Sequence, residues 1–268
     1  MGKSSKYTAK HPDRNGHIPY TEEENRVWHD LITRQRPIAE KYACNEYLEA
    51  LGRMHFPTDR IPQPDEVSAV LRQYTGWEVA PVPALIPFDQ FFALLAAKKF
   101  PAASFIRSRA EMDYLQEPDI FHEIFGHTPL LTDPRFAAFT HAYGQAGVKI
   151  DQHDHSMLAR LYWFTVEFGL MNTKQGLKTY GAGIVSSFGE TSYSVESDKP
   201  LRKPFDPLDA LRTPYRIDIY QTTYFIINGL EDMFQLAKMD LIGLIHEARR
   251  LGMHPPNYPP LEPKAVRA

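Results

Sequence analysis

The chain has 268 residues, of which 43% are hydrophobic and 12% aromatic, enough to fill the core of one large domain or two small ones. Its 30 lysines and arginines nearly balance 33 aspartates and glutamates, which excludes a phosphate-tracking surface and disfavours nucleic acid as a partner. The single cysteine, Cys44, excludes an internal disulfide framework and favours a reducing compartment.

The sequence contains no signal for membrane insertion or export. No segment approaches the roughly 18–20 apolar residues that span a bilayer, and the polar, basic N-terminus lacks the apolar stretch of a signal peptide. We therefore expect a cytoplasmic protein with no membrane partner. We also expect three parts: a polar arm over 1–19, one folded domain over 20–253, and a proline-rich tail over 254–268.

The apolar periodicity predicts a mainly α fold with minor β-structure. A capping box of Thr21 and Glu24 begins the first helix. Further helices are expected at about 37–51, 65–74, 88–99, 134–145, 155–171 and 230–251, and short strands at 78–82, 103–106 and 216–220.

Two histidines and an acid interrupt one apolar segment, at His122, Glu123 and His127. The histidines are five residues apart, which on a continuous α-helix would separate them by about 140°. Both could bind one ion only if the helix ended between them, and Gly126 predicts such an end. Without a metal, the pair would be two satisfied histidines at a helix terminus.

A third candidate ligand is Glu167, the only charged residue between Leu161 and Met171. A buried carboxylate is costly without a partner, so we expect an arginine or a metal beside it. Two histidines and one carboxylate leave one side of an ion open, as in non-haem Fe(II) oxygen chemistry. Zinc hydrolases use the same ligand types, so these residues alone leave both classes open.

At these residues the chain resembles the tetrahydropterin-dependent aromatic amino acid hydroxylases, most closely the bacterial phenylalanine 4-monooxygenase branch of that family. The similarity extends from about Tyr74 to Phe234. It rests on three motifs that occur in the family's order, at 114–127, 162–169 and 180–190. The resemblance implies that the folded domain is a single catalytic domain of this type.

The resemblance implies a role for each residue of the candidate metal site. His122, His127 and Glu167 match the family's iron ligands. Glu123 matches an acid that faces the pterin, and would otherwise be an exposed helix residue. Asp119 matches a carboxylate that orients the region of His122, and would otherwise be a simple helix cap.

Cofactor and substrate residues follow from the same resemblance. For the tetrahydropterin they are Leu85, Phe88, Phe91 as the stacking ring, Glu123 and Tyr162. Arg107 matches the arginine that holds the amino acid's carboxylate, a two-pronged contact that lysine would fill poorly. Around the amino acid they are Leu115, Trp163, Phe168, Gly183 and Ser186.

The resemblance implies that L-phenylalanine is hydroxylated to L-tyrosine with O2 and a tetrahydropterin at Fe(II). Animal relatives carry extra regulatory and tetramerisation segments that do not fit this chain, so we expect a monomer. A zinc hydrolase with Glu123 as base is disfavoured by the five-residue histidine spacing. The complete ligand set argues against a non-catalytic pterin or amino acid binding protein.

Overall fold

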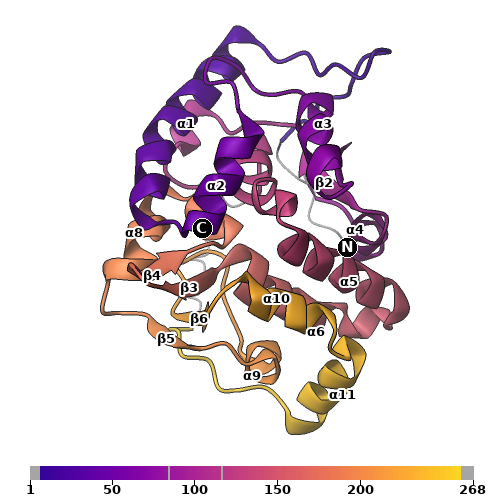
Figure 1. The fold of residues 1–268 in the computed structure, drawn as a ribbon, viewed down its shortest axis with the longest axis vertical. Helices are drawn as coiled ribbons and strands as arrows, with labels where there is room; N and C mark the ends of the chain where they lie inside the picture. Colours follow the sequence, from indigo (N-terminus) through magenta and orange to yellow (C-terminus); the bar gives the residue numbers. More distant parts are fainter. Residues whose placement is uncertain (1–6, 84, 116, 261–268) are drawn as a thin grey trace, which may run out of the picture.

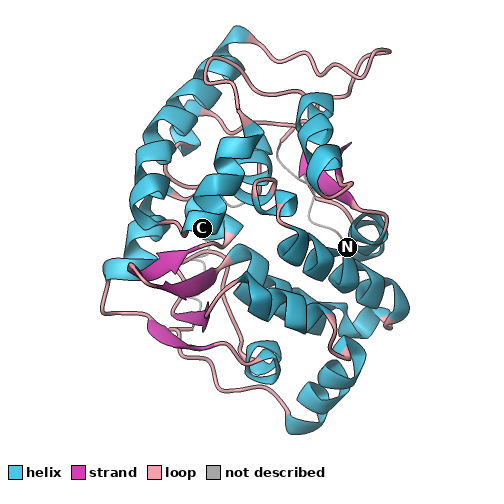
Figure 2. Ribbon diagram, in the orientation of Figure 1, coloured by secondary structure: helices cyan, strands magenta, loops and turns pink. Residues whose placement is uncertain are grey.

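The computed structural model describes residues 7–83, 85–115 and 117–260 and shows a mainly helical domain with two small sheets (Figures 1 and 2). The expected fold class is confirmed. Outside the described residues lie Ala84, Gln116, residues 1–6 of the predicted arm and residues 261–268 of the predicted tail.

The helices begin and end at the capping residues that the sequence supplies. The predicted capping box forms at α1, where the Thr21 hydroxyl accepts from the backbone N–H of Glu24 and the Glu24 carboxylate accepts from that of Thr21. The helices are α1 (Glu22–Tyr42), α2 (Asn45–Met54), α3 (Pro64–Tyr74), α4 (Phe88–Ala96), α5 (Pro134–Lys149), α6 (His155–Tyr162), α7 (Ala182–Val185), α8 (Phe188–Glu196), α9 (Pro207–Arg212), α10 (Leu230–Ala237) and α11 (Leu241–Leu251).

The strands are short and form two separate sheets. In one, β1 (Glu78–Val82) pairs in parallel with β2 (Lys99–Ala103), and Glu78 lies opposite Lys99. The other has the order β4 (Gly176–Thr179), β3 (Gly169–Thr173), β6 (Thr223–Ile227), β5 (Leu201–Pro204). Within this second sheet β3 and β4 are antiparallel, whereas β6 is parallel to both β3 and β5. In Figure 1 it lies below α1 and α2, on the left of the molecule.

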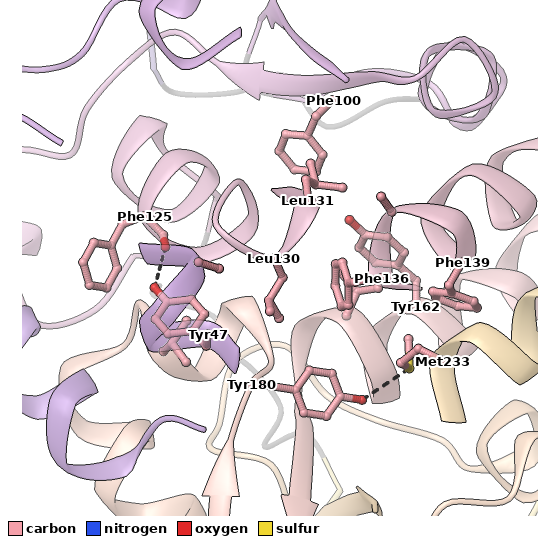
Figure 3. Packing of buried hydrophobic residues seen from close by; sticks show 14 of the residues in the cluster. Tyr47, Phe100, Phe125, Leu130, Leu131, Phe136, Phe139, Tyr162, Tyr180 and Met233 are labelled. Atoms are coloured by element: carbon pink, nitrogen blue, oxygen red, sulfur yellow. Dashed lines mark hydrogen bonds between the residues drawn. The ribbon is translucent and has the colours of Figure 1, made fainter. Parts of the chain in front are cut away.

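A continuous aromatic and aliphatic core surrounds the segment that carries the two candidate histidines (Figure 3). The Tyr47 hydroxyl, from α2, donates to the backbone carbonyl of Phe125 at 2.6 Å. The Tyr180 hydroxyl contacts the Met233 sulfur at 3.7 Å, joining the sheet to α10. The segment at Phe125 is therefore fixed both by packing and by a buried hydrogen bond.

Three helix predictions were wrong in their extent. The helix begun at Thr21 continues through Pro37 instead of ending there, and a new helix starts at Asn45. The predicted helix 230–251 is interrupted between α10 and α11, where the Asp240 carboxylate accepts from the N–H of Gly243 and caps α11. The helix predicted over 155–171 ends early and leads into β3.

Long-range pairing explains the remaining errors. Leu170 and Met171 pair with Ile226 and Ile227 of β6, so a run that is apolar enough for a helix becomes a central strand. The strand predicted at 216–220 is absent, and the nearby strand is β6. The strand predicted at 103–106 starts earlier, as β2. The helix 65–74 and the strand 78–82 are confirmed.

The described ends of the chain lie against the body. The ring of Tyr7 stacks on Phe105 with centroids 4.3 Å apart, and Ile18 is fully buried. Beyond α11, the N–H of His254 donates to the carbonyl of Arg212 at 2.9 Å. Among the described residues, none of the helices combines the length and apolarity that a bilayer crossing requires.

Cys44 lies fully buried between α1 and α2, where its backbone N–H donates to the carbonyl of Thr179 at 2.9 Å. Burial raises the pKa of its thiol to about 12. The side chain is therefore a small apolar residue of the core at neutral pH.

Helices α4 and α5 pack closely because α5 presents glycine to α4. A Cβ on Gly147 would lie 2.2 Å from the Phe92 ring, whereas a Cβ on Gly52, in α2, would meet nothing within 4 Å. We expect Gly147→Ala to lower the free energy of unfolding by about 1–3 kcal/mol through overpacking. Gly52→Ala should raise it by roughly 0.5–1 kcal/mol through helix propensity. Denaturant unfolding of both variants measures this, and stabilisation by both would contradict it.

Candidate active site

The two candidate histidines lie on one side of a π-helical turn, His122–His127, here called the first π-turn. Its hydrogen bonds join residues five apart, so His127 lies above His122 instead of 140° away. The two Nε2 atoms are 3.1 Å apart, and the rings are nearly perpendicular. The expectation that the helix ends between them was wrong, because the helix widens instead. Gly126 is needed for close packing, since a Cβ there would lie 2.9 Å from the Ala182 carbonyl oxygen.

Glu167 lies at the end of a second π-turn, Trp163–Glu167. The N–H of Phe168 donates to the carbonyl of Trp163 at 2.8 Å and closes this turn five residues apart. One carboxylate oxygen of Glu167 lies 3.1 Å from His127 Nε2, and the other lies 3.6 Å from His122 Nε2. Two wide turns from distant parts of the chain thus bring the three predicted ligands together.

A hydrogen bond that His122 donates to Ser186 fixes the tautomer of His122. The Ser186 hydroxyl donates its only proton to the Ala182 carbonyl at 2.7 Å, so at 2.9 Å it must accept a proton from His122 Nδ1. The lone pair of His122 is then on Nε2, which faces His127 and Glu167. Burial lowers the pKa of His122 to about 4, which keeps its ring neutral and able to bind a metal.

The donor set fits one divalent ion. Ligand bonds of about 2.1 Å at right angles place neighbouring donor atoms about 3 Å apart, close to the spacings of His122, His127 and Glu167. Burial pushes the pKa of the Glu167 carboxyl upward, but the neighbouring histidines outweigh burial and hold that pKa below its usual value. His127 Nδ1 is buried without a hydrogen-bond partner among the described residues.

Glu123 is a second carboxyl group near the same point. Its ligand atom lies within 4.8 Å of those of His122 and His127, but the contact with His127 Nε2 is 4.0 Å, longer than that made by Glu167. Burial, with the negative charges of Glu167 and Asp119, raises the pKa of Glu123 well above its usual value. Glu167 is therefore the better placed ligand.

Arg107 and Asp119 form a fully buried ion pair beside this centre. Asp119 accepts from Arg107 Nε at 2.8 Å and Nη2 at 2.9 Å, and also from the backbone N–H of His122 at 3.0 Å. This pairing uses one edge of the guanidinium and leaves the edge formed by Nη1 and Nη2 available for a second carboxylate. Asp119 thus links the candidate substrate clamp to the first π-turn.

All six residues predicted for the amino acid line one cavity of about 310 Å³, which also reaches His122 and Glu167. This size suits a small aromatic ligand. The Trp163 and Phe168 rings lie 4.4 Å apart on its wall. The lining residues predicted for the substrate are Arg107, Leu115, Trp163, Phe168, Gly183 and Ser186.

The residues predicted for the pterin are only partly brought together. Phe91 meets the ring of Tyr162 edge-on at 5.6 Å, and Tyr162 lies 6.1 Å from the His127 ring, so these two flank the metal-binding side. Leu85 lines the cavity and is half exposed. Phe88 stacks on Phe92 and lies outside this cavity's lining.

Sequence reasoning missed a polar network behind the aromatic wall. Trp163 Nε1 donates to Gln221 Oε1 at 2.9 Å, and the Gln221 N–H donates to Glu190 at 2.9 Å. The Tyr224 hydroxyl donates to the same Glu190 oxygen at 2.7 Å, and Tyr215 stacks on Trp163. The signal for Glu190 was its place as the only charge in the motif 180–190, whereas Gln221 had none.

Comparisons with known proteins show which family this chain belongs to. Residues 3–242 match the family described as biopterin-dependent aromatic amino acid hydroxylase. The phenylalanine-4-hydroxylase of Pseudomonas aeruginosa is 57% identical over 96% of this chain and 98% of its own. The apo structure of the cold-active phenylalanine hydroxylase from Colwellia psychrerythraea is 54% identical, with a TM-score of 0.91 over 94% of this chain and 97% of its own. The Chromobacterium violaceum phenylalanine hydroxylase with bound Fe(III) is 41% identical, with a TM-score of 0.86 over 91% of this chain and 89% of its own.

Glu190 predicts a pH dependence of stability. Burial raises its pKa from 4.5 to about 7, so the folded state binds a proton that the unfolded state has released. Its contribution to stability is therefore lost as pH rises from about 4.5 to about 7. Glu190→Gln keeps the accepting oxygen but cannot ionise. Relative to the wild type, it should gain on the order of 3 kcal/mol of unfolding free energy across that interval. A difference that stays constant with pH would contradict this.

Ser186→Ala should weaken metal binding. Without the hydroxyl, His122 Nδ1 loses the acceptor that fixes its tautomer, and loss of such a partner costs about tenfold to hundredfold in metal affinity. Competition with a chelator for Fe(II) measures the change. Ser187→Ala is the matched control, because the Ser187 hydroxyl caps α8 instead. Equal metal affinities for the two variants would rule out the orienting role of Ser186.

Proposed function

This chain belongs to the biopterin-dependent aromatic amino acid hydroxylases, and on that premise we propose that it hydroxylates L-phenylalanine to L-tyrosine with O2 and a tetrahydropterin. The observation that carries the proposal is one cavity lined by Arg107, His122 and Glu167, with His127 Nε2 3.1 Å from both His122 Nε2 and a Glu167 oxygen. Family membership favours this reaction over a zinc hydrolase or a non-catalytic binding protein.

We propose that His122, His127 and Glu167 hold Fe(II), and that Glu123 meets the pterin next to the ion. When bound, the iron and the reduced pterin supply the redox chemistry that splits O2. The protein contributes a neutral imidazole at His122 and an ionised carboxylate at Glu167, whose side chains are each 16% exposed.

Two kinds of cavity-lining residue would orient the substrate, an arginine and an aromatic pair. The free edge of Arg107 is suited to the α-carboxylate, while Trp163 and Phe168 offer a flat apolar wall for the ring. Gly183 keeps that wall close to the centre, since a Cβ there would lie 2.8 Å from the Phe168 ring. An amino acid held at both ends directs its ring toward the metal ligands.

For the pterin, the supporting observation is the aromatic layer of Phe91 and Tyr162 that extends to His127. Leu85 and Phe88 lie at exposed positions of the same neighbourhood, 52% and 48% accessible, and would be covered by a bound pterin. We further propose that the enzyme acts as a monomer in the cytoplasm, where its cysteine stays reduced.

The proposal is tested with His122→Ala and Glu167→Ala. We expect both to lose stoichiometric iron and to lower tyrosine formation by at least about a thousandfold, because each removes one of three ligands. Iron content and tyrosine are measured separately. His29→Ala, an exposed histidine whose ring contacts the Thr58 carbonyl, is the matched control and should retain both. Wild-type enzyme that makes no tyrosine with iron, pterin, O2 and phenylalanine present would refute the proposal.

A further inference from the structure

Glu117 is an acidic residue that lines the candidate substrate cavity and is not one of the candidate metal ligands. It lines the cavity together with Arg107, and one of its carboxylate oxygens is buried without a hydrogen-bond partner. Within the described part of the chain, no donor group lies within hydrogen-bond distance of that oxygen. Partial burial of a carboxylate carries a free-energy cost unless a cation or a hydrogen-bond donor lies beside it.

The other acidic residues of the cavity lining are already paired. Asp113 forms an ion pair with Arg34 at 2.6 Å. Glu190 accepts from the backbone of Gln221 and from a tyrosine hydroxyl. Glu167 faces the two histidines. Among the acids that line this cavity in the described structure, Glu117 is therefore the one available to a ligand.

The chemistry of the substrate supplies the missing partner. An amino acid at neutral pH carries an ammonium as well as a carboxylate, and both groups must be desolvated when it enters a cavity. Arg107 is the proposed binding partner of the substrate's carboxylate. Glu117 follows Arg107 by ten residues along the chain and lies two residues before Asp119, which holds the guanidinium in place. The same segment thus presents one cation and one free anion to the cavity.

We propose that Glu117 binds the α-ammonium group of the amino acid substrate, so that Arg107 and Glu117 together recognise the zwitterion. The inference rests on the proposed function, because it assigns a residue to that substrate. It implies selection for free amino acids over aromatic acids that lack the amino group. Charge-assisted hydrogen bonds of this kind change affinity by about tenfold to a hundredfold.

The test compares L-phenylalanine with 3-phenylpropionate, which has the same ring and carboxylate but no amino group. The KM of phenylalanine and the inhibition constant of 3-phenylpropionate are measured in the iron-loaded enzyme with pterin and O2. For Glu117→Gln we expect the KM to rise about tenfold or more, while kcat and the inhibition constant of 3-phenylpropionate change less than about twofold. Glu117→Asp, which keeps the charge, should recover part of the lost affinity.

Asp113→Asn is the matched control, because it removes the same charge from the same cavity lining at a residue that is already paired. Its KM for phenylalanine should stay within about threefold of the wild type, the scale of a weak surface pair. Equal weakening of both ligands by Glu117→Gln would overturn the proposal, and so would an unchanged KM. If Glu117→Gln does not fold, the test rests on Glu117→Asp. A Glu117→Asp variant that folds but binds phenylalanine no better than 3-phenylpropionate would also overturn the proposal. A wild-type enzyme that forms no tyrosine would instead refute the proposed function.

Discussion

A single buried carboxylate, that of Asp119, connects the parts of the site that must act together. It accepts two hydrogen bonds from the Arg107 guanidinium, one from the Arg107 backbone N–H, and a fourth from the backbone N–H of His122, where the first π-turn begins. Removing one member of a buried ion pair typically costs about 3–5 kcal/mol, because the other charge is left uncompensated. The orientation of the arginine and the start of the histidine-bearing turn therefore depend on the same side chain.

The two π-turns explain why the site was recognisable in the sequence although its geometry was not. The motifs identified the candidate ligands, and the structure gathers the ligand atoms of His122, His127 and Glu167 within 3.6 Å of one another. The angle of about 140° expected between the two histidines on an α-helix was wrong, because the local widening of a helix into a π-turn leaves no periodic signal in the sequence. What holds the wide turn in place is distant packing, such as the approach of the Ala182 backbone to Gly126.

The same limit applies to the fold. Caps and apolar periodicity were sufficient to locate α3, α4, α5 and the start of α1, since these signals are local, whereas the short helices α7, α8 and α9 were not predicted. The second sheet was missed because β3 and β6 are more than fifty residues apart and each is stabilised by the other, at Leu170 with Ile226 for example. Glu190 and Glu117 were also passed over in the sequence. What distinguishes them is their surroundings in the folded chain: hydrogen-bond donors surround Glu190, whereas one oxygen of Glu117 is buried without any donor among the described residues.

The burial of Cys44 bears on how the protein tolerates its own chemistry. Oxidants attack the thiolate form of cysteine, and a thiol with a pKa near 12 in a closed core is almost entirely protonated at neutral pH. A protein that handles O2 thus carries its only thiol where neither peroxide nor a second chain can reach it. Covalent dimers linked through sulfur should consequently not accumulate when the protein ages in air.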